Sequence, residues 1–143
     1  MKKYPGKEIS KYYFDLLSDI KIDNKEIPVY NLARIGIEPP YIMLVNQTAT
    51  GRNTKGSYSD DTTIIIQCVT HFEGNFGGDE FADKIANEVT EKIFENRPDY
   101  GTTNNFKIVT TQITSNETLR EQTSTDVLII RQLTISNFIS QLN

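Results

Sequence analysis

The stretch Thr62-Thr-Ile-Ile-Ile-Gln-Cys-Val-Thr-His-Phe72 carries the clearest structural signal in the chain. Side chains alternate between the two faces of a strand, so residues two apart share a face. Apolar residues occupy both faces near the start of this stretch, which predicts a strand that is central in its sheet or covered on both sides. One face would hold Ile64, Ile66, Cys68, Thr70 and Phe72, and the other Ile65, Val69 and His71.

Three further segments outside this stretch also show strand patterns. Residues 41–50 alternate, with Tyr41, Met43 and Val45 on one face and Ile42 and Leu44 on the other. The segments 106–115 and 126–136 predict two more strands near the C-terminus. The polar stretches 51–61 and 116–125 predict projecting loops, and the second would join the last two strands as a long hairpin.

Two segments predict helices. Apolar residues recur at steps of three and four over 8–18 and again over 79–95, where Pro98 and Gly101 follow the helix. Between 20 and 30 the pattern alternates around Asp23-Asn24, which predicts a small hairpin. Pro28 lacks an N–H group, so this piece should lie at a sheet edge.

These elements predict an α+β fold, a mainly antiparallel sheet with two helices packed on it, in the order helix, hairpin, strand, strand, helix, strand, strand. Two helices are too few to cover both faces, so one face should stay partly free. The 143 residues fit a single domain, 1–143, with frayed ends near 1–6 and 138–143. An excess of β-branched residues, 18 Ile and 16 Thr against 8 Leu, agrees with a sheet-rich chain.

Composition narrows the choice of partners. The net charge is −4 and no cluster of Lys and Arg occurs, which argues against specific nucleic-acid binding. No apolar run approaches the roughly 18 residues of a membrane helix, and no signal peptide follows Lys2 and Lys3. The single cysteine, Cys68, cannot form an internal disulfide.

Reactive residues do not form a catalytic or metal-binding pattern. Cys68 and the only histidine, His71, lie three apart on one strand and should point to opposite faces, so they share neither a metal nor a catalytic pair. Asp60-Asp61 would diverge in the same way and is expected in a solvated turn. The glycines at 74–78 lack the phosphate-loop ending. We therefore expect no enzyme activity, no cofactor and no metal.

Arg131 is the charge that most needs an explanation. It lies on one strand face between Ile129 and Leu133. A charge among apolar neighbours requires a partner or access to water. We expect an ion pair with an acidic residue, either within the fold or across a subunit interface.

Several of these features occur in an order that resembles the tail completion or tail terminator proteins of long-tailed bacteriophages and related prophage tail machines. The resemblance spans about residues 27–136. It is carried by Ile27-Pro-Val-Tyr30, Pro40-Tyr-Ile-Met-Leu44, Thr50-Gly-Arg-Asn-Thr-Lys55, Thr62-Thr-Ile-Ile-Ile-Gln-Cys-Val-Thr70, Phe81-Ala-Asp-Lys-Ile-Ala86 and the two C-terminal strands.

The resemblance implies a small non-enzymatic α+β subunit that forms a ring, usually a hexamer. Such a ring caps the tail tube and presents a surface to the head, so its partners are further copies of itself, the tail tube protein and a head-completion or neck protein. DNA would pass through the ring without specific binding. The subunit would be made in the host cytoplasm and end in the virion. The implied contact residues are Arg52, Asn53, Lys55 and Tyr58 in the loop 51–61. Arg131, from the charge argument above, is a further candidate for a subunit interface.

Two other functions stay open at this stage. A head-closure or neck connector protein would have a similar size and charge. A cytoplasmic ligand-binding or enzymatic α+β domain would place Arg131 in one pocket with Asp60 and Asp61, and Arg131→Ala would then abolish ligand binding while leaving assembly intact.

Overall fold

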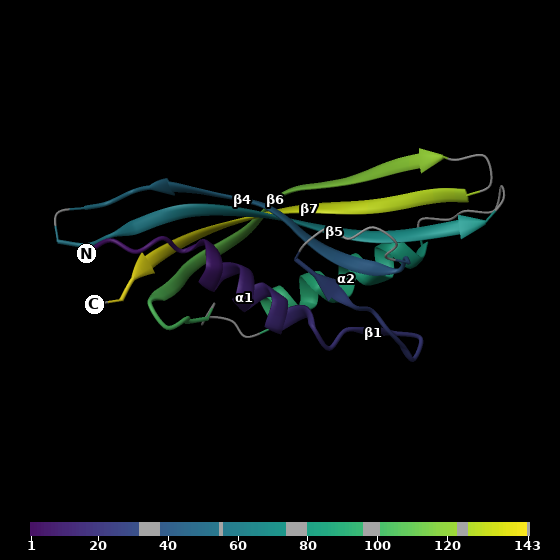
Figure 1. The fold of residues 1–143 in the computed structure, drawn as a ribbon, viewed down its shortest axis with the longest axis horizontal. Helices are drawn as coiled ribbons and strands as arrows, with labels where there is room; N and C mark the ends of the chain where they lie inside the picture. Colours follow the sequence, from purple (N-terminus) through teal and green to yellow (C-terminus); the bar gives the residue numbers. More distant parts are fainter. Residues whose placement is uncertain (32–37, 55, 74–79, 96–100, 123–125, 143) are drawn as a thin grey trace.

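The computed structural model describes residues 1–31, 38–54, 56–73, 80–95, 101–122 and 126–142. It confirms an α+β fold with two helices on a sheet-rich frame (Figure 1). The elements in chain order are α1 (Gly6–Leu17), β1 (Lys21–Ile22), β2 (Lys25–Glu26), β3 (Val29–Tyr30), β4 (Tyr41–Gly51), β5 (Ser59–Glu73), α2 (Glu80–Phe94), β6 (Phe106–Gln122) and β7 (Asp126–Gln141).

The main sheet has five strands in the order β3-β4-β5-β7-β6. β5 lies between β4 and β7 and pairs antiparallel with both, which confirms the central strand predicted from 62–72. β6 pairs antiparallel with β7. The predicted small hairpin is the separate pair β1–β2. The chain then continues through Pro28 into β3, which runs parallel to β4 at the sheet edge, so this edge is mixed.

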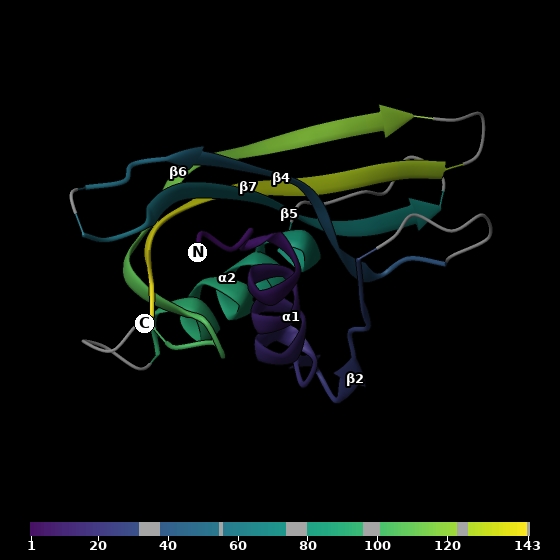
Figure 2. The ribbon, with the colours of Figure 1, turned by 60° about the vertical axis from the view of Figure 1, so that its left-hand side comes forward.

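Both helices lie on one face of the sheet (Figures 1 and 2). α2 packs on β5 and β7, and α1 packs on β3, β4 and α2. The core forms where the apolar stripe of each helix meets the inward residues of the strands, including Ile64, Ile66 and Cys68 of β5, none of which is more than 1% exposed. No described helix covers the opposite face, as the helix count predicted. We call this opposite face the open face.

The predicted loop 51–61 is shorter than expected. β4 runs to Gly51 and β5 begins at Ser59, so Asp60 and Asp61 are strand residues rather than part of a solvated turn. Asp60 pairs with Gly51 and Asp61 with Thr50 in the antiparallel ladder. Backbone pairing with β4 and β7 holds these polar residues in the strand. Beyond the strand ends, an isolated bridge between Thr54 and Ser57 pairs the two sides of the hairpin.

The predicted loop 116–125 is also largely strand. β6 continues to Gln122, and residues 116–122 pair one for one with β7. The hydropathy pattern did not indicate a strand here, because these residues are polar, mostly exposed and do not alternate in hydropathy. The end of the predicted hairpin, 123–125, lies outside the described residues.

The two ends of the chain are better ordered than predicted. β7 includes Phe138–Gln141, and Ile139 within it is fully buried, so this end is not frayed. α1 begins at Gly6 rather than Glu8. The residues before it carry no helix or strand, yet the backbone N–H of Lys3 donates to Gln141 Oε1 at 2.8 Å. The termini therefore meet at one end of the sheet (Figure 1).

Candidate assembly surfaces

The β4–β5 hairpin tip holds the first of the predicted contact residues, Arg52. Its backbone N–H donates to the carbonyl of Ser59 at 2.8 Å and closes the hairpin. Its guanidinium lies 3.2 Å from Asp61 Oδ2 and stacks 5.3 Å from the ring centroid of Phe138 on β7. The pair is well exposed, so it orients the arginine more than it stabilises the fold. Arg52 is thus held over the end of the sheet with its charge in solvent.

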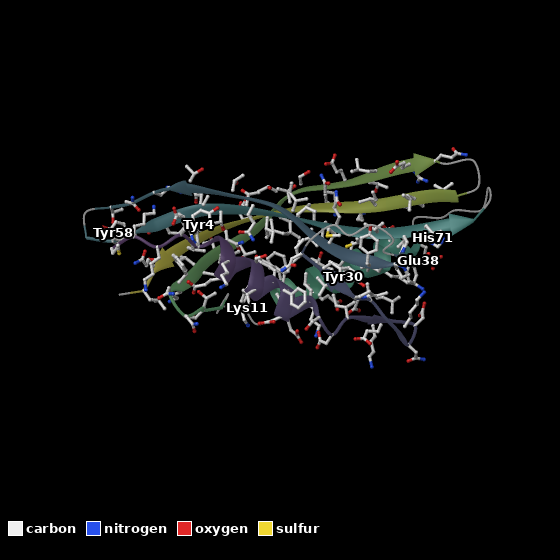
Figure 3. All side chains as sticks on the ribbon, viewed as in Figure 1. Tyr4, Lys11, Tyr30, Glu38, Tyr58 and His71 are labelled. Carbon is white, nitrogen blue, oxygen red and sulfur yellow. The ribbon has the colours of Figure 1, made fainter. Side chains whose placement is uncertain are left out.

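Asn53 and Tyr58 lie beside Arg52 at the same tip. Asn53 Oδ1 accepts hydrogen bonds from Lys2 Nζ at 3.1 Å and from the Ser59 backbone at 3.3 Å. The carbonyl of Tyr58 accepts from the Gln141 backbone at 2.8 Å, while its side chain stays 38% exposed. Figure 3 shows Tyr58 at the extreme end of the molecule. Lys55, the fourth predicted contact, lies outside the described residues.

A half-buried ion pair fixes this tip to the N-terminus. Lys2 Nζ lies 3.0 Å from Asp60 Oδ1, whose side chain is only 5% exposed. Adjacent strand residues diverge, so Asp61 faces the other way and binds Arg52 instead. No local pattern signals a contact between residues 58 positions apart, and sequence reasoning missed it. Its effect is to make the N-terminal residues part of the tip surface.

Arg131 does not belong to this tip. Its Nη1 lies 3.0 Å from Asp83 Oδ1 on α2 and donates a 2.6 Å hydrogen bond to Thr118 Oγ1 on β6. This confirms the expected ion pair, and the partner lies within the fold. Arg131 pairs in register with Cys68, eight residues along β5 from Asp60, a span of roughly 27 Å at strand spacing. The structure therefore does not bring Arg131 together with Asp60 and Asp61.

The reactive residues are placed as the strand parity predicted. Cys68 is fully buried under the helices, whereas His71 lies on the open face. Burial raises the pKa of the Cys68 thiol to about 12, although nearby Arg131 opposes the shift. Such a thiol stays protonated and unreactive at neutral pH. Within the described ranges, no three His, Cys, Asp or Glu residues lie close enough to hold a metal, and no helix is long and apolar enough to span a membrane.

An apolar row crosses the open face from one side of the sheet to the other. The strand registers align Tyr41 on β4, Val69 on β5, Ile130 on β7 and Leu119 on β6. Val69 is 3% exposed, while Leu119 at the end of the row is 39% exposed. At the other end, the ring of Tyr30 on β3 meets Tyr41 edge to face, with centroids 6.0 Å apart.

A chain of amide hydrogen bonds runs beside this row. Gln67 Nε2 donates to Gln132 Oε1, and Gln132 Nε2 donates to Glu117 Oε1, each at 2.8 Å. The three residues come from β5, β7 and β6 and are register neighbours. Their bonds to one another satisfy polar groups across the open face and tie β6 to the sheet centre. Neither the apolar row nor this series of hydrogen bonds could be predicted from the sequence, because both depend on strand order and register.

A groove lies on the helical side, between α1 and the edge strand β3. Its volume is about 760 Å³. Phe14, Val29 and Tyr30 supply its apolar lining, and polar side chains surround them; the lining residues are Lys7, Ser10, Lys11, Phe14, Asp15, Val29, Tyr30 and Asn31. Figure 3 shows Lys11 on α1 and Tyr30 on the edge strand β3.

The comparisons with known proteins give a structural likeness and no sequence match. The sequence matches no protein-family profile and no curated protein. Among solved structures, the fold is similar to a chain in the virion of a native gene transfer agent particle, with a TM-score of 0.59 over 80% of this chain and 78% of that chain. The two sequences are 14% identical, so the likeness concerns the fold.

Proposed function

We propose that this chain is a structural subunit of a phage-like particle, and specifically a tail terminator that forms a ring on the end of the tail tube. The observation that carries the proposal is the shared fold with a virion chain over about four fifths of both proteins. The motif order over residues 27–136 points to the same class independently of that likeness. In this proposal the chain is not an enzyme and needs no cofactor.

The open face and the hairpin tip are the surfaces that the proposed function would use. A ring subunit contacts two neighbours through two different surfaces, because head-to-tail contacts close by rotation. It also needs a third surface for the tube. We assign the tube contact to the β4–β5 tip, where Arg52, Asn53 and Tyr58 stand at one end of the sheet beside Lys2.

A head-closure or neck connector protein is the second candidate function. It would share the virion location and the ring, but it would not touch the tail tube. Labelling of assembled particles, or placement of the subunit in a density map, distinguishes the two by whether the subunit contacts the tube directly.

The third function, a ligand-binding or enzymatic domain, receives little support from the residues suggested for its pocket. Arg131 binds Asp83, Asp60 binds Lys2 and Asp61 binds Arg52, so each charge has its own partner. Arg131 is also roughly 27 Å along the sheet from the acidic pair. A site that depends on their proximity does not fit this arrangement.

Deletion of the gene from its phage or prophage tests the tail terminator proposal. We expect tails of irregular and excessive length in electron micrographs, with heads that carry no tails, and recovery of normal length when the gene is restored. Tails of normal length in the deletion strain would overturn the proposal. Normal-length tails that fail to join heads would favour the neck connector.

A further inference from the structure

A group of polar side chains lies buried between the sheet and α1, on the face that the helices cover (Figure 2). The strand registers place Thr62 on β5 beside Asn137 on β7, and Asn137 beside Thr111 on β6. Their exposed fractions are 4%, 2% and 8%, so all three lie inside the protein. Tyr13 of α1, which is 1% exposed, reaches Asn137 with its hydroxyl. We call these four residues the polar site.

Part of the polar site is satisfied within the protein. Asn137 Oδ1 accepts a hydrogen bond from the Thr111 hydroxyl at 2.7 Å and another from the Tyr13 hydroxyl at 3.1 Å. These two bonds use both lone pairs of the amide oxygen. They join β6, β7 and α1 at one buried point, and they leave the amino half of the amide group to find a partner elsewhere.

Two buried polar atoms of the site have no hydrogen-bond partner among the described residues. They are Asn137 Nδ2 and Thr62 Oγ1. Leaving a buried polar group without a partner is costly, and native proteins rarely do so. Rotating the Asn137 amide by 180° would exchange its oxygen and nitrogen, since both neighbouring hydroxyls can accept as well as donate. One amide atom and the Thr62 hydroxyl would still lack a partner.

The two unpartnered atoms belong to directly opposed residues. Thr62 and Asn137 are a cross-strand pair in the antiparallel register of β5 and β7. The Cβ atoms of such a pair are roughly 4.5–5.5 Å apart, which keeps the two side chains close. No direct hydrogen bond joins them. One small molecule between the two side chains could therefore bond to both.

The polar site also has room for a small molecule, because its side chains are smaller than those beside it. On β7, Asn137 is flanked on the same face by Ile135 and Ile139, both fully buried. On β4, the residue paired with Thr62 is Ala49. Isoleucines pack the core to either side, whereas the alanine, threonine and asparagine fill less of the space between strand and helix.

We propose that the polar site binds one water molecule, which accepts a hydrogen bond from Asn137 Nδ2 and bonds to the Thr62 hydroxyl. These two groups supply the two to four polar partners that a buried water needs. An ion does not suit the site, because its side chains are neutral and the nearby Asp60 is already paired with Lys2. The water would complete the contact between α1 and the sheet, and it does not depend on the assembly proposed above.

Thr62→Val tests the bridge by removing the hydroxyl while keeping the shape of the side chain. With the water in place, the variant takes one partner from it, and we expect the folding equilibrium constant in urea unfolding to fall about fivefold. Without a water, the hydroxyl is only an unpartnered group, and its removal should leave stability unchanged or raise it. Thr63→Val, at the half-exposed neighbour on the same strand, is the matched control for the preference of strands for valine.

Oxygen-17 magnetic relaxation dispersion counts long-lived buried water molecules and is not affected by exchange of hydroxyl protons. We expect the wild type and Thr63→Val to hold one such molecule more than Thr62→Val. A crystal structure should show a water oxygen within roughly 2.7–3.2 Å of Thr62 Oγ1 and of the Asn137 amide. Equal counts in the three proteins, or no water oxygen beside these two atoms, would overturn the proposal. A Thr62→Val variant at least as stable as its control would do the same.

Discussion

Glu8 shows how one side chain can tie a helix to a distant loop. Its Oε1 accepts from the Thr103 hydroxyl at 2.8 Å and from the Asn105 backbone at 2.9 Å, and its Oε2 accepts from the Asn105 side chain at 2.8 Å. Desolvation raises the pKa of Glu8, but these hydrogen bonds and nearby Lys3 outweigh it and leave the pKa below its ordinary value of 4.5. The ionised carboxylate is therefore the form that the fold stabilises.

Glu8→Gln should make the free energy of unfolding less dependent on pH in the acid range. Because the folded pKa is lowered, the contribution of Glu8 is complete above pH 4.5 and disappears as the pH falls through the folded pKa. We expect a loss of about 1 kcal/mol at pH 7 after allowing for solvent screening, and a smaller difference below pH 4. Urea unfolding at both pH values measures this. An equal difference at both would contradict the assignment.

Arg131 should act as a structural link between α2 and the β6–β7 hairpin. Arg131→Ala removes the ion pair to Asp83 and the hydrogen bond to Thr118, and we expect a loss of about 1–2 kcal/mol in urea unfolding. Asp83 is 44% exposed, so water limits the cost. Arg131→Met keeps most of the packed stem and should lose less. Unchanged stability with loss of assembly would instead place Arg131 at a subunit interface.

At the scale of the element, the β1–β2 turn requires a left-handed backbone. Asp23 and Asn24 have φ of 51° and 67°, the pattern of a tight two-residue hairpin turn. Asn24→Gly should stabilise the protein by about 0.5 kcal/mol, and Asn24→Val should destabilise it by about 1 kcal/mol. Chemical denaturation checks both, with Lys25→Val on the exposed neighbouring strand as the control. Equal effects of valine at 24 and 25 would contradict a role for φ.

The sequence predicted element type better than element extent, and the reason is physical. Strands beginning at Tyr41, Phe106 and Asp126 start where predicted, because inward apolar residues mark them. The far end of the strand that begins at Phe106 was missed, because residues 116–122 are held by backbone bonds to β7 rather than by buried side chains. The parallel placement of β3 was missed as well, since nothing within two residues specifies which strand they will join.

At the scale of the whole molecule, the candidate surfaces were predicted only in part. The tip residues Arg52, Asn53 and Tyr58 do share one end of the sheet. Their partners were not foreseeable, because Lys2 and Gln141 come from opposite ends of the chain. Hydropathy reports whether a side chain is buried locally, whereas these contacts follow from the order and direction of the strands.

The C-terminal residues should be essential to the fold rather than frayed. Ile139 is fully buried, pairs with Ile108 on β6 and with Asp60 on β5, and lies two residues before the Gln141 contacts with the N-terminus. Ile139→Ala should cost about 2–4 kcal/mol, as for other buried isoleucines. Truncation after Phe138 removes this side chain and its strand pairing together, so it should unfold the protein or expose it to protease.

Truncation after Gln141 is the matched control for this experiment. It removes Leu142, which is 41% exposed, together with Asn143, and it leaves the strand and the Gln141 side chain in place. We expect a loss below about 1 kcal/mol, since the Leu142 backbone makes one hydrogen bond to Asn105. If both truncated proteins unfolded at the same denaturant concentration as the wild type, the last residues of the strand would be dispensable. If only the longer one unfolds early, the end of β7 holds both termini and the hairpin tip in one surface.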